Sequence, residues 1–301
     1  MKFAILALLA LIGLGIAAAA VLWAAFPRSI PAPESRVEGD PAQLARGRYL
    51  VNHVALCLSC HSERDWDRQS GPVVASTAGQ GATHTIFSPE DAPAANITPF
   101  ALGDWSDGEI ARAITSGLNR QGEPLHPDMP YYVYARLAES DVMAIVAYLR
   151  TLPRIDHQPP KASPPFLISM VGRVLPKPYQ AKPMPPQDDS VARGRYLVNA
   201  AGCRMCHGGD LAGGMRLNIP GGGSVTSVNL TPHPKARVMG WSREAFVAAF
   251  KAFAVEEVRQ LETPRDRNTV MPWIQYSDMT ETDLGAIYDY LKTVPPVAPD
   301  S

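Results

Sequence analysis

The sequence predicts an all-α fold, with one N-terminal transmembrane helix followed by two tandem helical domains. Three sequence blocks occur twice in the same order, which indicates a duplicated domain. Apolar residues recur at spacings of three and four, and no convincing run alternates apolar and polar residues as a strand does. The 301 residues are enough for two domains with separate cores. We expect an anchor (1–29), a first domain (40–155), a linker (156–187) and a second domain (188–297).

The repeated blocks define the two domains. Ala-Arg-Gly-Arg-Tyr-Leu-Val-Asn occupies residues 45–52 and 192–199, and Asn-Ile/Leu-Thr-Pro occupies residues 96–99 and 229–232. A Trp-Ser pair follows in both halves, and Met-Pro-Tyr/Trp then occupies residues 129–131 and 271–273. Each half closes with Tyr-Leu-Arg/Lys-Thr-Leu/Val-Pro. Two homologous domains of roughly 110 residues each explain this order most simply.

Five main helices are expected, at residues 41–55, 188–201, 106–116, 140–152 and 280–294. Ser106 and Glu109 have the spacing of a capping box. The pairs Ser140-Asp141 and Thr280-Glu281 supply N-cap candidates for the last helix of each half, and a proline ends each of these helices.

Glycines and tyrosines in these helices predict close helix packing. Gly47 and Gly194 would allow the opening helix of each half to approach a neighbour closely. Four tyrosines are expected at the crossings of opening and closing helices. They are Tyr49, Tyr196, Tyr148 and Tyr290.

The N-terminus carries an uncharged run of 24 residues, 3–26. A helix of that length reaches roughly 36 Å and spans a hydrocarbon core about 30 Å thick. The alternative is a cleavable signal peptide, whose apolar region is shorter, about 7–15 residues. We therefore expect an uncleaved single-pass anchor.

Composition limits the possible partners. The net charge of −1 offers no electrostatic argument for binding nucleic acid or an anionic membrane surface. About ten prolines lie within residues 153–186, which indicates a linker rather than a packed core. The middle of this linker, residues 166–175, is apolar, and the sequence leaves open whether it covers a domain surface or touches a membrane.

All four cysteines lie in two Cys-Xaa-Xaa-Cys-His units, so none remains for a structural disulfide. Two thiols on one helical turn can bond to one edge of a porphyrin, and the next histidine can bind its iron. We predict two covalently bound haem c groups. The predicted attachment residues are Cys57, Cys60, Cys203 and Cys206, and the predicted iron ligands are His61 and His207. A thioredoxin-like pair would need a βαβ setting, and a pooled zinc site would leave both histidines unexplained.

The sixth iron ligand is predicted from the repeat. Met129 and Met271 occupy equivalent positions, each in a Met-Pro-aromatic loop before the last helix, and the proline stiffens that loop. Methionine opposite histidine raises the reduction potential, which suits an electron carrier. The alternatives are Met279, whose partner position is Leu137, and His126. The other histidines are expected in loops or at the surface: His53, His84, His157 and His233.

Four further repeated side chains are candidates for the edge of each haem pocket or for contacts to haem propionates. They are Trp105, Trp241, Asn96 and Asn229. Ordinary packing is the equally supported alternative.

The order of these motifs resembles the cytochrome c subunits of membrane-bound bacterial dehydrogenases that oxidise alcohols, gluconate and related sugars. The resemblance covers residues 42–297 apart from the linker, and it implies a class I cytochrome c fold for each domain. It also implies haem attachment outside the cytoplasmic membrane, with the haem domains in the periplasm. Some members of that family carry three haems, whereas this chain has two motifs.

We therefore expect an electron-transfer protein rather than an enzyme, passing electrons from a dehydrogenase to the respiratory chain through an oxidase or a quinone-linked complex. The sequence has no paired carboxylates at catalytic spacing, no Ser-His-Asp arrangement and no Gly-rich phosphate loop. Two alternatives stay open: a two-haem subunit of a terminal oxidase, and a two-haem peroxidase or thiosulfate-oxidising enzyme. The peroxidase alternative needs an iron with an open coordination position, which paired methionines would not leave.

Overall fold

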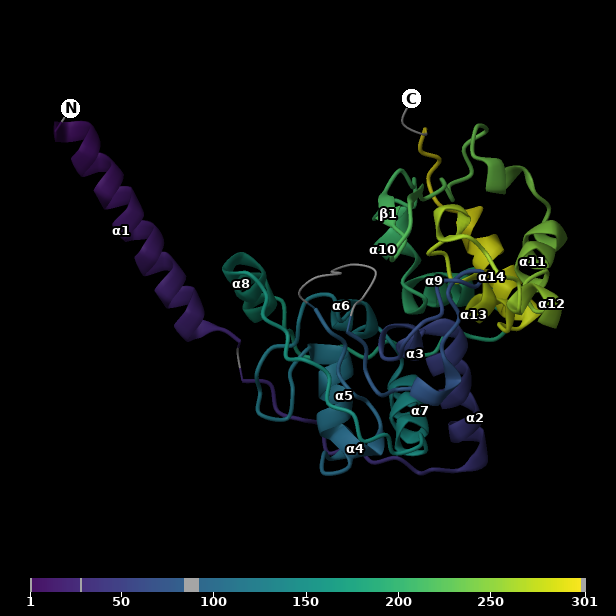
Figure 1. Cartoon of the computed structure of the whole chain (residues 1–301), viewed down its shortest axis with the longest axis horizontal. Coiled ribbons are helices and arrows are strands. Elements are labelled where there is room, and N and C mark those ends of the chain that lie inside the picture. Colours follow the sequence, from purple (N-terminus) through teal and green to yellow (C-terminus); the bar gives the residue numbers. More distant parts are fainter. Residues whose placement is uncertain (1, 28, 84–91, 299–301) are drawn as a thin grey trace.

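The computed structural model describes residues 2–27, 29–83 and 92–298, and consists of one projecting helix and a compact helical body (Figure 1). The projecting helix is α1 (Lys2–Ala25), and none of its residues is buried. It is the one helix in the described ranges that is long and apolar enough to cross a bilayer, with a mean hydropathy of 2.8. An unburied helix that is apolar on all sides is typical of a segment that lies in a membrane rather than in water.

The first half of the body is built from short helices around a pair of longer ones. Its opening and closing helices, α2 and α7, pack along each other, and α5 packs on α6 and α7. Its elements are α2 (Pro41–Tyr49), the π-helix η1 (Leu50–Val54), α3 (Cys57–Cys60), the 3-10 helix η2 (Ala75–Thr77), α4 (Pro99–Leu102), α5 (Asp107–Ser116), α6 (Tyr131–Tyr134) and α7 (Glu139–Arg150).

The second half repeats this pattern after the linker helix α8 (Phe166–Val174). Here α9 packs along α14, and α11 packs on α13 and α14. Its elements are α9 (Ser190–Ala200), α10 (Cys203–His207), β1 (Arg216–Asn218), β2 (Ser224–Thr226), the 3-10 helix η3 (Arg237–Gly240), α11 (Arg243–Lys251), α12 (Glu256–Arg259), the 3-10 helix η4 (Arg265–Arg267), α13 (Trp273–Ser277) and α14 (Glu281–Leu291).

One element departs from the predicted all-α fold. Strands β1 and β2 form an antiparallel ribbon in which Leu217 lies opposite Val225. Each strand has only three residues, which is too short for an alternating pattern to be visible in the sequence. Three glycines, residues 221–223, precede β2 and form the turn.

The predicted helix starts are correct at two positions and wrong at a third. Ser106 and Glu109 form a complete capping box at the start of α5, and the Thr280 hydroxyl accepts a hydrogen bond from Asp283 N at the start of α14. Helix α7, however, begins after Ala138, so neither Ser140 nor Asp141 is its N-cap. The Asp141 carboxylate is instead buried and bound to other side chains.

The two halves differ by one residue just before the first cysteine of each motif. Four residues separate Asn52 from Cys57, whereas three separate Asn199 from Cys203. The structure accommodates the extra residue as the π-helix η1, in which Ala55 N donates to Leu50 O, five residues back. In α9 the matching bond runs from Ala201 N to Leu197 O, four residues back. Insertion of a residue as a π-turn is common near functional sites.

The two halves are joined by a reciprocal contact around two buried carboxylates, Asp141 and Asp283, each with a side chain only 1% exposed. Arg46 binds Asp141 with two nitrogens, at 2.8 and 2.7 Å, and the Tyr196 hydroxyl of the other half donates to it at 2.6 Å. In the mirror arrangement Asp283 binds Arg193 of its own half. It also accepts the Tyr49 hydroxyl of the first half at 2.6 Å. Each half therefore supplies a tyrosine that satisfies a buried charge in the other.

The tyrosine predictions are therefore correct for one pair and wrong for the other. Tyr148 and Tyr290 lie where α7 and α14 cross the opening helices, against Gly47 and Gly194. Tyr49 and Tyr196 instead reach from one half to the other. A Cβ atom at position 47 would lie 1.9 Å from Ala144 O, and one at position 194 would lie 1.8 Å from Ala286 O. Only glycine therefore allows the helices to approach this closely.

Replacing either helix-crossing glycine is expected to destabilise the protein. Gly47→Ala or Gly194→Ala puts a methyl group into a backbone carbonyl, and we expect a loss of about 2–4 kcal/mol of unfolding free energy because the helices must separate. Denaturant unfolding of the full chain measures the loss. The control is Gly240→Ala, whose added Cβ meets nothing within 4 Å, and which should change stability by less than about 0.5 kcal/mol. Equal stability of all three variants would contradict the close approach.

Candidate functional site

A single cavity contains both Cys-Xaa-Xaa-Cys-His motifs and both repeated methionines. Its empty volume is about 1850 Å³, part of it open to solvent. Most of its wall is apolar or aromatic, with the larger share from the second half, including Phe246, Phe250 and Trp273. The predicted site residues that line it are Cys57, Cys60, His61, Met129, Cys203, Cys206, His207 and Met271. The fold thus brings all eight predicted residues to one apolar space.

Each motif helix begins directly after a residue in the left-handed conformation. That residue is Leu56 (φ 54°) before α3 and Gly202 (φ 63°) before α10. A left-handed leucine costs roughly 1–2 kcal/mol, so the surrounding structure must hold it in place. A tyrosine hydroxyl does this in both halves: Tyr134 donates to Ala55 O and Tyr276 donates to Ala201 O, each at 2.7 Å.

These two tyrosines were missed in the sequence, although the repeat contains a signal for them. Tyr134 and Tyr276 each lie five residues after the repeated methionine, in α6 and α13. Their hydrogen bonds tie the methionine loop of each half to the start of its cysteine motif. The hydrogen bond that holds the methionine loop beside the cysteine motif is therefore present in both halves.

Both motif histidines are oriented by a backbone carbonyl. His61 Nδ1 lies 2.7 Å from Ala95 O, and His207 Nδ1 lies 2.8 Å from Val228 O. Since a carbonyl oxygen only accepts, Nδ1 carries the proton and Nε2 keeps its lone pair. Burial lowers the pKa of both imidazoles below the ordinary value, which favours the neutral ring. A neutral imidazole with a free Nε2 and an anchored Nδ1 is the arrangement typical of a metal-binding histidine.

The repeated asparagines position these carbonyls rather than lining the cavity. Asn96 directly follows Ala95, and its side chain donates to Ile155 O and His157 O while accepting from Thr98. Asn229 directly follows Val228 and is held in the same way by Val297 O and Thr231. For both asparagines the packing alternative is therefore correct.

The two tryptophans differ from each other. Trp241 lines the cavity, whereas Trp105 is absent from its wall and packs against the hydrophobic core. The prediction of a shared pocket-edge role therefore fits one member of the pair.

The cysteine side chains are half-buried, and the pKa of each thiol is raised. Burial raises the pKa of Cys57 and of Cys203 to about 12, and that of Cys206 to about 11. Such thiols stay protonated near neutral pH, unlike the low-pKa cysteine of a thioredoxin-like pair. Cys60 and Cys206 line the same cavity, so the two motifs are neighbours across the halves. Within residues 2–27, 29–83 and 92–298, no cluster of three or more His, Cys, Asp or Glu side chains forms a pooled metal site.

The alternative ligands lie in different places. Met279 lines the cavity, as the repeated methionines do, and is 1% exposed. His126 is not part of the cavity wall and contacts Asp128. His84 lies outside the described residues.

Arg64 is a cavity residue with no signal in the repeat, because the equivalent position in the second half is Asp210. Its guanidinium donates to Ser70 O and Gly71 O and lies 4.2 Å from the centre of the Trp66 ring. Burial lowers its pKa to about 10, so it remains a cation at neutral pH. The first motif therefore has a positive charge beside it that the second lacks at the same position.

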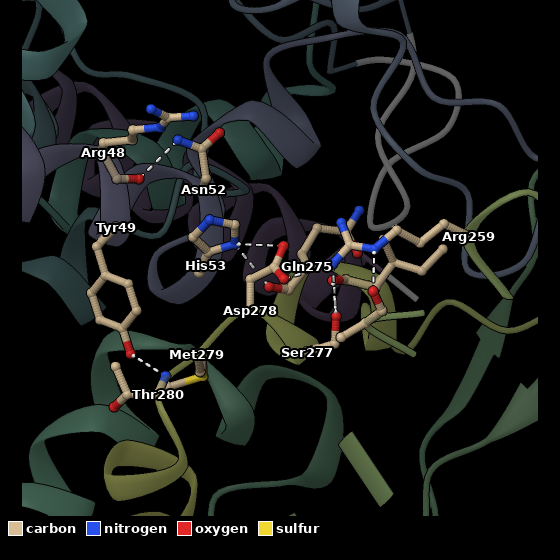
Figure 2. Close-up of polar contacts among 12 residues, drawn as sticks. Arg48, Tyr49, Asn52, His53, Arg259, Gln275, Ser277, Asp278, Met279 and Thr280 are labelled. Atoms are coloured by element: carbon tan, nitrogen blue, oxygen red, sulfur yellow. Dashed lines mark hydrogen bonds and ion pairs between the residues drawn. The ribbon is translucent and has the colours of Figure 1, made fainter. Parts of the chain in front are cut away.

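His53, expected at the surface, lies between the two halves (Figure 2). It belongs to η1, which packs on α13, and its Nδ1 donates to Gln275 O at 3.1 Å. Asp278 lies 3.8 Å from the same nitrogen and is itself bound by Arg259 at 2.6 Å. The expectation was wrong because the inserted π-turn, invisible to helical periodicity, packs this segment against the other half.

The half-buried position of His53 predicts a pH dependence of stability. Burial lowers the pKa of its imidazole below the ordinary value near 6.5, and the nearby cations Arg259 and Arg48 lower it further. Gln275 O and the Asp278 carboxylate raise the pKa, but by less than burial lowers it. The unfolded chain therefore takes up this proton first, and its contribution to stability is lost as the pH falls below about 6.5.

His53→Asn keeps a donor for Gln275 O but does not titrate, so we expect a shallower fall in the melting temperature of the haem-loaded chain between about pH 8 and pH 5. The matched control is His157→Asn, which removes an exposed histidine and should keep the parent profile. A parent-like profile for His53→Asn would contradict the assignment.

Comparison with known proteins identifies homologues. The chain is 28% identical over 289 residues to the cytochrome c subunit of a quinone alcohol dehydrogenase from Gluconacetobacter polyoxogenes, covering 87% of this chain and 58% of that protein. It is also 28% identical to the fructose dehydrogenase cytochrome subunit of Gluconobacter japonicus, covering 89% of this chain and 56% of that one. A diheme cytochrome c-type protein of Cereibacter sphaeroides is 28% identical, over 94% of this chain and 95% of its own length.

No protein-family model matches the chain. The chain spans slightly more than half the length of the dehydrogenase subunits and nearly the whole of the diheme protein. Its homologues are thus cytochrome c electron-transfer subunits and a diheme cytochrome c, in agreement with the resemblance in the motifs.

Proposed function

We propose that this chain is a membrane-anchored, two-haem cytochrome c that carries electrons from a dehydrogenase toward the respiratory chain. The observation that carries the proposal is the single apolar cavity in which both Cys-Xaa-Xaa-Cys-His motifs meet both repeated methionines. The histidine tautomers support it, because each leaves Nε2 free to bind a metal.

The proposed site has two equivalent halves. Cys57 and Cys60 would hold one haem, with His61 and Met129 as iron ligands. Cys203 and Cys206 would hold the other, with His207 and Met271 as ligands; all eight residues line the cavity. Each half is a class I cytochrome c domain in this proposal, and the duplicated helix pairs α2–α7 and α9–α14 support that division. When bound, the haems supply one-electron chemistry at iron, and methionine ligation favours a high potential.

The chain's own residues set the conditions for that chemistry. The carbonyls of Ala95 and Val228 orient the histidines, and the apolar wall excludes water and keeps the local dielectric low. If His61 and Met129 held one iron and His207 and Met271 the other, they would leave no coordination position for peroxide or thiosulfate. Because both motifs line one cavity, the groups that they would hold would be neighbours inside the protein.

The proposed location is the cytoplasmic membrane, with α1 as a single-pass anchor and the haem-bearing body in the periplasm. The length and apolarity of α1 support a membrane span, since a helix of 24 residues is longer than the hydrocarbon core is thick. The proposed donor is a dehydrogenase, by analogy with the alcohol and fructose dehydrogenase subunits, and the acceptor is an oxidase or a quinone-linked complex.

The methionine assignment predicts a spectroscopic loss. Oxidised protein with His–Met ligation shows a weak near-infrared methionine-to-iron band, and Met129→Ala or Met271→Ala should each remove about half of it. The control is Met184→Ala, since Met184 is 41% exposed and absent from the cavity wall. An undiminished band in both variants, or a bis-histidine or high-spin spectrum in the native protein, would overturn the assignment.

The proposed electron-transfer role predicts a partner protein in the membrane. Purification of the tagged full chain from detergent-solubilised membranes should yield a flavin- or quinone-dependent dehydrogenase subunit with it, and adding that enzyme's substrate should reduce both haems. The control is a chain carrying Cys57→Ala and Cys203→Ala, which should not be reduced. Co-purification of a haem-copper oxidase subunit without a dehydrogenase would favour the oxidase alternative instead.

A further inference from the structure

Helix α8, in the linker, exposes a broad apolar face. Phe166, Leu167 and Val171 are 60%, 74% and 48% exposed, and Ile168 and Val174 are exposed as well. At 100° per residue, Leu167 and Val174 lie on the side of α8 away from Gly172, which is buried. An apolar surface of this kind on a folded body marks a contact with another molecule or with lipid.

The other side of α8 is fixed to the body. Gly172 packs against Leu125 O and Pro127, in the segment that leads to Met129. The helix therefore has a definite orientation, with its apolar face turned away from the first half.

Helix α8 also touches the lower end of α1 (Figure 1). Arg173 donates to Trp23 O at 2.9 Å, and its guanidinium lies 4.1 Å from the centre of the Trp23 ring. Trp23 is two residues from the end of α1. Tryptophan at the end of a span and arginine beside it are typical of the boundary between hydrocarbon and water. This contact places the apolar face of α8 at the level where α1 would leave the bilayer.

The charge of the linker matches a lipid surface. Residues 157–187 contain Lys161, Arg173, Lys177 and Lys182 but no Asp or Glu, although the whole chain has a net charge of −1. The overall charge gave no reason to expect binding to an anionic membrane, because acidic residues elsewhere in the chain offset the positive charge of this segment. A helix with an apolar face and basic neighbours is typical of one that lies in the headgroup region.

We propose that α8 lies in the interface of the bilayer crossed by α1, with Phe166, Leu167 and Val171 among the acyl chains and the basic residues at anionic headgroups. The proposal rests on the proposed anchor. Two attachments, α1 and α8, hold the body in one orientation, whereas α1 alone would attach it to the bilayer at a single point. The cavity with both motifs then faces the membrane surface at a set angle.

The test uses the full-length, haem-loaded chain in nanodiscs of phosphatidylglycerol and phosphatidylcholine. A single new thiol, Leu167→Cys, is reacted with a water-soluble maleimide, and Leu261→Cys, at a 53% exposed leucine far from α8 in sequence, is the matched control. The unsubstituted chain gives the background. We expect the thiol at 167 to react about tenfold more slowly than the thiol at 261, because the interface buries the apolar face about 5–10 Å deep. Val171→Cys gives a second reading if the first variant is poorly produced.

Each outcome decides the matter. Equal rates at 167 and 261 in a chain that stays in the nanodisc overturn the placement of α8 and leave the anchor intact. Protection that appears only after a dehydrogenase subunit is added means that a protein covers this face, which also overturns the proposal. Loss of the chain from the nanodiscs in a high-salt wash overturns the anchor itself, and with it the placement of α8.

Discussion

The arrangement of the site depends on two buried carboxylates, Asp141 and Asp283. Each is neutralised by an arginine of its own half and hydrogen-bonded by a tyrosine of the other. A buried carboxylate needs its hydrogen-bond partners, and separating the halves would remove one tyrosine hydroxyl from each of the two carboxylates. The contact is reciprocal. It holds the two halves in an arrangement in which both motifs line a common cavity.

Each repeated block has a distinct physical task around that cavity. The first block supplies the arginine, the glycine of the helix crossing and the tyrosine of the reciprocal contact. The Asn-Xaa-Thr-Pro block fixes the carbonyl that orients the motif histidine. The Met-Pro block brings in the methionine and, five residues later, the tyrosine that holds the start of the motif.

The asymmetries are as informative as the repeat. One inserted residue produces the π-turn that carries His53 to the other half, and Arg64 lies beside the first motif at the position that Asp210 occupies in the second half. Two sites built from equivalent blocks are thus given different surroundings. Differences in local charge and polarity are the means by which a protein separates the potentials of chemically identical groups. At the other end of the molecule, α1 and α8 meet through Trp23 and Arg173, which links the body to the apolar helix at a second point.

The sequence by itself determined the helical class, the motifs, the repeated methionines and the places of the main helices, because these depend on local periodicity and on residue types at short spacing. Only the tertiary structure decided what Asp141, Tyr49 and His53 do. Asp141 has the local pattern of a helix cap, yet its partners lie 95 and 55 residues away. His53 and Gln275 are 222 residues apart. Which distant side chains meet is set by how two helix pairs pack, and a pattern of single-residue preferences contains no such information.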